Sequence, residues 1–181
     1  EAVDELATAL SDKQAEVRKQ AAIALGKLGP KSKPAAEELI RVLTDSDVRE
    51  AARRALTQIG PPAIDSLLVS VDDQQRWFDV SRVVMKIDPQ KAKQAGLDKA
   101  TVDNLPALQL VLHDLTRPSE ELAAAANSLA LLGTDGTAVL IEAFQSEQVA
   151  RVAYEAFAKG AADAVPALAA ALRHESPQVR A

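Results

Sequence analysis

The sequence predicts an all-α fold, an α-solenoid of about five to six stacked helix pairs. A 13-residue pattern first appears as VRKQAAIALGKLG from Val17 and returns as VREAARRALTQIG from Val48. Each copy follows a segment whose apolar residues are spaced i, i+3, i+4 and i+7, as on one face of a helix. Aromatic residues make up only 3% of the 181 residues. The core must therefore consist of small and branched aliphatic side chains that pack at close range, as between helices.

The apolar stripes predict six first helices, one at the start of each pair. Two of the stripes carry one polar member each, Gln109 and Thr137. Prolines fall at or near the start of four first helices, where a missing amide hydrogen costs nothing and the fixed φ favours the helix. These prolines are Pro34, Pro62, Pro106 and Pro166. The stripes begin at Val3, Ala36, Ile64, Leu105, Thr137 and Val165.

The recurring pattern predicts the second helix of each pair. Its further copies start at Arg76, Glu121 and Val149, and the chain closes on a stub, VRA, from Val179. A glycine just past a second helix is expected to take the left-handed conformation that ends a helix. Three glycines meet this condition: Gly29, Gly60 and Gly133. The unit is therefore a helix, a short turn, a second helix and a stop, and such pairs bury their apolar faces by stacking on their neighbours.

The helix pairs define a single domain over residues 1–181. The chain opens inside a first helix without a polar capping repeat and closes inside a second helix, whereas a stable array needs capped ends. We therefore expect this sequence to be a fragment of a longer protein. The predicted repeats span about 1–33, 34–61, 62–88, 104–134, 135–162 and, in part, 163–181.

Residues 89–103 are an insert between the third and fourth repeats. Asp88 and Pro89 have the residue types of a helix N-cap and first position, and Gly96 is a suitable stop, so we expect a short extra helix. Inserts in solenoids lie on one face and often near the binding surface. A lengthened connector that only alters the superhelical twist is an equally open interpretation.

Composition excludes several classes of function. The net charge of −5 comes from interspersed acidic and basic residues, which gives no basic field for nucleic acid. The chain has no cysteine, so it has neither thiolate metal sites nor a cysteine nucleophile. Apolar runs such as VPALAAAL are far shorter than the roughly 20 residues of a membrane helix. The N-terminus has no signal-peptide pattern, so we expect no membrane contact within this segment and a cytoplasmic location by default.

The pattern L-x-D-x-x-V-R-x-x-A-x-x-A-L-x-x-I-G over residues 43–60 resembles the short HEAT-like repeat of bacterial proteins, the kind also found in phycobilisome lyases. The resemblance covers essentially the whole chain. It implies that the turn aspartate and the arginine at the start of the second helix form an ion-pair ladder between successive repeats. The arginine position holds Trp77, Leu122 and Ala150 in the middle repeats, which breaks this ladder. The implied ladder members are Asp12, Arg18, Asp45, Arg49 and Arg180.

The resemblance also raises enzyme alternatives. Iron-dependent deoxyhypusine hydroxylase has this fold and binds its metal through several His-Glu pairs, whereas this chain has only His113 and the single pair His174-Glu175. Two isolated histidines cannot supply such a ligand set. HEAT-like DNA glycosylases need a basic concave face, which the acidic charge balance opposes. A bilin lyase would share the fold, but no residues indicate a bilin pocket. We therefore predict no enzyme, with no catalytic, cofactor-binding or metal-ligating residues, and keep a lyase-like or metal-hydroxylase-like module as the alternative.

The remaining interpretation is a non-enzymatic scaffold that binds a partner protein on its concave face, which the second helices line in this family. Arginines and aromatic residues at outward positions are favoured in interface hot spots. An acidic or aromatic-bearing segment would suit them, because guanidinium groups bind carboxylates bidentately and stack on rings. Trp77 and Phe78 have a second interpretation, in which they fill the gap left by the missing ladder arginine. The predicted binding residues are Arg53, Arg54, Phe78, Arg82, Asn127, Arg151 and Tyr154.

Overall fold

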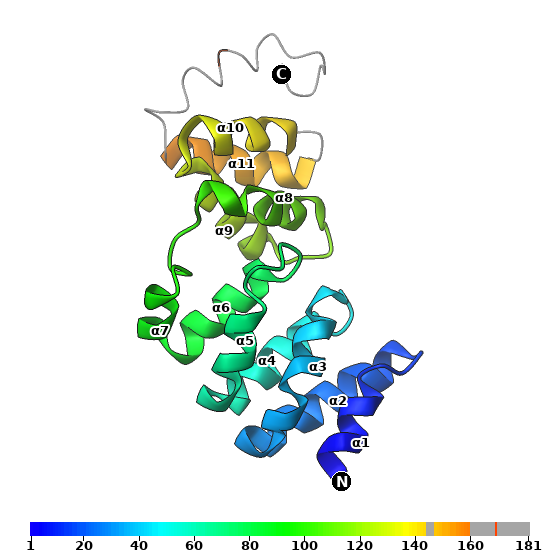
Figure 1. Ribbon diagram of the computed structural model, residues 1–181. Coiled ribbons are helices and arrows are strands. Elements are labelled where there is room, and N and C mark those ends of the chain that lie inside the picture. The colour runs from blue at the N-terminus through cyan, green and yellow to red at the C-terminus, as the bar shows by residue number, and fades with distance from the viewer. Residues whose placement is uncertain (144–146, 160–168, 170–181) are drawn as a thin grey trace. The chain divides into compact units, whose positions relative to one another are not determined.

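The computed structural model describes residues 1–143 and 147–159 together with Ala169 (Figure 1). Every regular element in these residues is helical, and none of them forms a strand. The helices follow one another in short pairs, so the predicted all-α, solenoid-type fold is confirmed. The chain divides into two compact units, residues 1–98 and residues 99–181, called here the N-terminal and the C-terminal unit.

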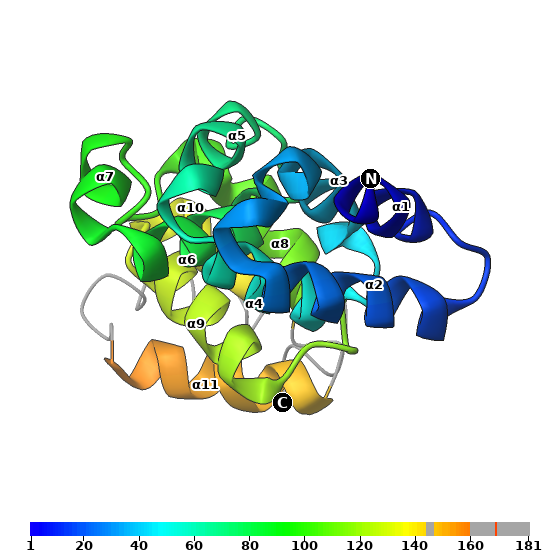
Figure 2. The same cartoon turned by 90° about the horizontal axis from the view of Figure 1, so that it is seen from below.

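The N-terminal unit contains three helix pairs and one additional short helix. The pairs are α1 (Ala2–Ala9) with α2 (Ala15–Leu28), α3 (Ala36–Arg41) with α4 (Arg49–Ile59), and α5 (Ile64–Val69) with α6 (Trp77–Ile87). Short 3₁₀ segments, Gly29–Ala35, Val42–Thr44 and Pro61–Ala63, lie at the ends of first and second helices. Figure 2 shows α1, α3 and α5 on one side of this unit and α2, α4 and α6 on the other.

Aliphatic side chains from both layers form the core of the N-terminal unit. The predicted stripe of α3 is buried in full, from Ala36 through Leu39 and Ile40 to Leu43. The second helices bring their small residues together: α2 packs along α4, where a Cβ built on Gly26 would lie only 3.0 Å from the Cα of Ala55. This close approach of backbones is what an alanine-rich, aromatic-poor core requires.

Gly29 and Gly60 end α2 and α4 as the sequence predicts, but with a different backbone conformation. Their φ angles are 59° and 73°, and their ψ angles are −133° and −144°. This region of positive φ and extended ψ is open essentially to glycine alone. Each glycine precedes a proline, which disfavours a helical ψ in the residue before it. The second helices therefore stop in an extended turn and not in the left-handed helical conformation.

Aspartates organise the turns between first and second helices. In each of four turns, one carboxylate oxygen accepts a hydrogen bond from the backbone amide two residues further on, at 2.7 to 3.2 Å. A side chain that binds its own backbone in this way fixes a tight turn. The four residues are Asp12, Asp45, Asp73 and Asp114. Predicted ladder aspartates therefore also shape the turn locally.

The insert forms the predicted short helix, α7 (Pro89–Gln94). Asp88 caps it, since its carboxylate accepts hydrogen bonds from the amides of Gln90 and Lys91, both at 3.0 Å. Gly96 follows the helix with a φ of 71°. The helix packs against α6 and buries Ala92, so this part of the insert belongs to the N-terminal unit, which ends at residue 98.

The C-terminal unit continues the helix pairs. It contains α8 (Leu105–His113), α9 (Ser119–Ala130), α10 (Gly133–Glu142) and α11 (Glu147–Lys159), with a short 3₁₀ turn, Val102–Asn104, before α8. Helix α9 contacts each of α8, α10 and α11. Gly133 has the predicted positive φ, 64°, but also starts α10, four residues ahead of the predicted stripe. Apart from Ala169, the sixth repeat lies outside the described residues, including Pro166, His174, Glu175, Val179 and Arg180.

Gly136 marks a close contact between α10 and α9. A Cβ at this position would overlap the carbonyl oxygen of Leu129, a backbone atom that can move only with its helix. We expect Gly136→Ala to destabilise the C-terminal unit by about 1–3 kcal/mol, although alanine favours a helix by about 1 kcal/mol over glycine. Urea unfolding followed by circular dichroism measures the change. The matched control is Ala138→Gly on the exposed face of α10. If helix propensity decided the outcome, Gly136→Ala would stabilise the protein, and the close-contact interpretation would be wrong.

Candidate interaction surface on the second helices

A buried carboxylate joins the second and third helix pairs. Asp79 on α6 has no exposed surface, and its Oδ1 accepts a hydrogen bond from Arg53 Nη1 on α4 at 3.3 Å. Arg49 Nε, at the start of α4, lies 3.9 Å from Asp79 Oδ2 and donates to the carbonyl oxygen of Leu43 at 3.0 Å. Two arginines of one repeat thus converge on one aspartate of the next.

The predicted ladder is confirmed at its first rung and altered at its second. Arg18 Nε donates to Asp45 Oδ2 at 2.8 Å, and its Nη2 lies 2.7 Å from the same oxygen. Arg49 should by analogy reach the next turn aspartate, Asp73, but reaches Asp79 instead. Asp73 pairs with Arg76 of its own turn at 3.3 Å. The carboxylate that Arg49 contacts therefore lies within α6 and not in the turn before it.

Phe78 and Arg53, which were predicted to face outward, are largely buried. Phe78 is only 6% exposed, and its neighbour Trp77 only 7%. The outward placement of Phe78 is therefore wrong, and both rings lie in the interior, as their second interpretation proposed. The Arg53 side chain is 13% exposed and contacts Glu50 in addition to Asp79. Arg53 therefore mainly contacts other residues of the same unit.

Arg54 and Arg82 are the predicted binding residues of this unit that reach the surface. The Arg54 side chain is 73% exposed, and its Nε donates to Glu50 Oε1 at 2.7 Å. Arg82 is also exposed, and its guanidinium carbon lies 5.5 Å from the centroid of the Phe78 ring, in cation–π range. The two arginines hold the same place in the repeat pattern, on neighbouring helices that pack together.

Glu50 lies between the arginines of α4 and keeps its negative charge. Burial alone would raise the pKa of this carboxyl, but the hydrogen bonds and charges of Arg53 and Arg54 outweigh it and lower the pKa from 4.5. Stability from these contacts is therefore present above the ordinary pKa of Glu50 and is lost as the pH falls through the lowered value. At neutral pH an acidic ligand must compete with Glu50 for Arg54.

The two layers of the N-terminal unit differ in charge. In the second helices α2, α4 and α6, most of the exposed charged residues are basic. The exposed acidic residues of these helices are Glu16 and Glu50. The basic residues are Lys19, Lys27, Arg54, Arg82 and Lys86. The charged residues of the first helices α1, α3 and α5 are mainly acidic, and Arg41 is their basic member. The acidic residues are Asp4, Glu5, Glu37, Glu38 and Asp65. A chain of net charge −5 thus presents a basic face.

The other three predicted residues belong to the C-terminal unit. Asn127 on α9 is partly buried. On α11, Tyr154 is 70% exposed and Arg151 is exposed, with its Nε 3.8 Å from Glu155 Oε1. They occupy second helices that contact each other. Their role in binding stays a prediction, as does that of the four residues in the N-terminal unit.

Sequence reasoning missed two buried ionic groups. Asp79 occupies in α6 the position of Ala51, a buried position in α4. Arg117 and Glu121 are 6% and 1% exposed and form an ion pair of 2.9 Å between Nη1 and Oε2. In both cases the signal was available: a charged residue at a core position of the repeat indicates a buried partner.

The described part of the chain contains no group of three or more His, Asp or Glu residues that could hold a metal ion. His113, at the end of α8, lies with its Nδ1 2.8 Å from the carbonyl oxygen of Gln109. Among these residues no helix has the length and apolar character needed to span a membrane.

Comparisons with known proteins relate part of the chain to a repeat family. Residues 3–84 match the family model for HEAT repeats, and no curated protein matches the chain. The chain is similar to crystal structures of engineered proteins. One is 21% identical, with 99% of this chain and 92% of that chain covered and a TM-score of 0.41. A second is 23% identical, with 98% of this chain and 55% of that chain covered and a TM-score of 0.37. A third is 20% identical, with 98% of this chain and 93% of that chain covered and a TM-score of 0.41. Residues 3–84, the part of this chain that is similar to HEAT repeats, include most of the three helix pairs of the N-terminal unit.

Proposed function

We propose that this chain is a non-enzymatic interaction scaffold whose second-helix face binds an acidic segment of a partner protein. One observation carries the proposal: Arg54 and Arg82 are exposed at equivalent positions of α4 and α6, in a face with an excess of basic residues. Repeat proteins of stacked helix pairs present extended surfaces of this kind to their partners. The HEAT-repeat match supports the scaffold class.

The geometry of the two arginines suits carboxylates. Packed helices lie about 8–10 Å apart, which is close to the span of two or three residues in an extended peptide at about 3.3 Å per residue. Acidic side chains at that spacing would meet one guanidinium each. Arg82 rests on the Phe78 ring, so its side chain is partly ordered before binding and loses less entropy on forming a contact.

Alanine replacement of Arg54 and Arg82 tests the surface. Each change is expected to weaken partner capture by about 1–3 kcal/mol, because exposed arginines at an interface centre are frequent hot spots. Little change in the melting temperature is expected. A pull-down with the intact chain and mass spectrometry identifies the partner, and isothermal titration calorimetry then gives Kd for each variant.

Two controls separate binding from folding. Lys33→Ala, at an exposed position of the connector between α2 and α3, should leave Kd unchanged. Arg49→Ala should mainly lower the melting temperature, because Arg49 is 8% exposed and contacts both Leu43 and Asp79. The proposal is wrong if Arg54→Ala and Arg82→Ala are silent while substitutions on α1, α3 and α5 abolish capture.

A further inference from the structure

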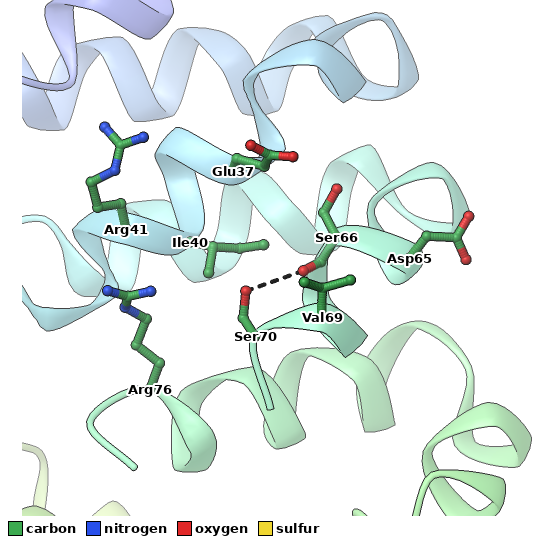
Figure 3. Close-up of a pocket in the computed structure, with 8 residues that line it drawn as sticks. All are labelled: Glu37, Ile40, Arg41, Asp65, Ser66, Val69, Ser70 and Arg76. Atoms are coloured by element: carbon green, nitrogen blue, oxygen red, sulfur yellow. Dashed lines mark hydrogen bonds between the residues drawn. The ribbon is translucent and has the colours of Figure 1, made fainter. Parts of the chain in front are cut away.

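A pocket opens on the first-helix side of the N-terminal unit, away from the surface proposed above. It has a volume of about 460 Å³ and lies between α3, α5 and the turn before α6 (Figure 3). This volume is within the roughly 300–1,000 Å³ that small-ligand pockets occupy. Its lining combines two arginines, two carboxylates, two serines and two aliphatic side chains.

Arg41 and Arg76 form the basic side of the pocket. Figure 3 shows both side chains on the same side of the opening, Arg41 from α3 and Arg76 from the turn before α6. Arg76 binds Asp73 through Nη2 at 3.3 Å, while its Nε is enclosed and has no hydrogen-bond partner. A buried donor without an acceptor is unfavourable. A carboxylate in the pocket would meet the exposed part of the Arg76 side chain, which is 28% exposed, and not the enclosed Nε.

Glu37 and Asp65 bring negative charge to the same pocket. In Figure 3, Asp65 lies across the pocket from the arginines and Glu37 lies near its upper edge. Both carboxylates are exposed, and neither pairs with a cation in the part of the chain that the structure describes. A simple anion would be attracted by the arginines and repelled by these carboxylates. A ligand with one negative and one positive group would find a partner for each.

The space between the charged sides has the chemistry of a peptide site. Val69 is 84% exposed there and offers an apolar surface between the charged groups. The Ser70 hydroxyl donates to the carbonyl oxygen of Ser66 at 3.2 Å, which leaves the hydroxyl oxygen free to accept a hydrogen bond from an amide. We infer that this pocket binds a short zwitterionic peptide, whose carboxylate meets Arg41 and Arg76, whose cation meets Asp65 and Glu37, and whose aliphatic side chain covers Val69.

Titration of the intact, ¹⁵N-labelled chain with defined peptides tests this inference. The probe is acetyl-Lys-Val-Glu-amide, and binding should shift the backbone amide signals of Ser66, Val69 and Ser70. Uncapped Val-Val-Val carries its two charges at its termini. Tighter binding of Val-Val-Val would indicate a free peptide as the ligand, and tighter binding of the capped peptide would indicate an internal segment of a protein. Capped Glu-Val-Glu and Lys-Val-Lys should bind more weakly. Equal binding by either like-charged peptide, or shifts confined to other residues, would overturn the inference.

Substitutions on opposite sides of the pocket provide the second test. Arg41→Gln and Asp65→Asn should each weaken binding of acetyl-Lys-Val-Glu-amide by about three- to tenfold, since each removes a partly exposed charge pair. Lys13→Gln, in the turn between α1 and α2, is the matched control and should have no effect. Arg41 and Asp65 are exposed, so these variants should fold. Unchanged affinity in both pocket variants would refute the site.

Discussion

Replacing Asp79 by alanine is expected to destabilise the N-terminal unit by about 3–5 kcal/mol, the usual cost of breaking a buried ion pair from one side. Asp79 is fully buried, and both Arg49 and Arg53 direct guanidinium nitrogens toward its carboxylate. Without that charge, two cations that are about 10% exposed lose the anion between them. Such groups are costly to hold away from water. Loss of the carboxylate should weaken the packing of the second helix pair against the third.

Urea unfolding, followed by circular dichroism and by fluorescence of Trp77, measures this change. Trp77 is the single tryptophan of the chain and lies on the same helix as Asp79. Asp79→Asn keeps the shape and removes the charge, so its effect separates electrostatics from packing. The matched control is Asp47→Ala at an exposed turn position, for which we expect a change within about 0.5 kcal/mol. Equal effects of Asp79→Ala and Asp47→Ala would contradict the role assigned to the buried carboxylate.

The helix pairs were predictable because their signals are local. Apolar spacing determines which face of each helix is buried, and Gly29 and Gly60 end their helices through backbone angles that other residues resist. The N-cap of α7 was equally visible, since Asp88 and Pro89 act within one turn. These interactions involve residues that are close in sequence, so a single chain is enough to identify them.

The side-chain roles on the surface were predicted less well, because they depend on neighbouring repeats. Phe78 occupies the position of the exposed Glu50 in the repeat pattern, yet its ring lies in the interior. Position in a repeat gives the direction of the Cα–Cβ bond, whereas a large side chain can turn back toward unfilled space. The α6 helix lacks the ladder arginine, and two aromatic rings are buried at its start.

The pocket could not be predicted from the sequence at all. Its charged groups come from α3, α5 and a turn. Glu37 and Asp65 hold equivalent positions of their repeats, but Arg41 and Arg76 stand where the other repeats carry no arginine. Arg76 takes the place of the buried Val48, and nothing local indicates that its side chain reaches the first helices. Only the stacking of successive pairs brings these groups together, so their arrangement is a property of the tertiary structure.

Glu121 supplies the corresponding test in the C-terminal unit. We expect Glu121→Ala to destabilise this unit by about 3–5 kcal/mol, because Glu121 is 1% exposed and pairs with Arg117, which is 6% exposed. Glu121 also lies in the first turn of α9, where a negative charge is favoured by the helix dipole. Denaturant unfolding gives the value, and Glu120→Ala, at the exposed neighbouring position, is the control.

A double replacement decides what the buried pair contributes. Exchange of a buried ion pair for apolar residues of similar size is often neutral or stabilising, since neither charge then has to leave water. Arg117→Met combined with Glu121→Leu should therefore recover most of the stability lost in Glu121→Ala, because it removes the guanidinium that the single change leaves buried beside Asp114, whose Oδ2 lies 3.4 Å from Arg117 Nε. If the double variant is as unstable as the single one, the loss comes from the other contacts of these side chains and not from the buried guanidinium. If Glu121→Ala itself is harmless, Arg117 can reach water without Glu121, and the pair does not determine the stability of the unit.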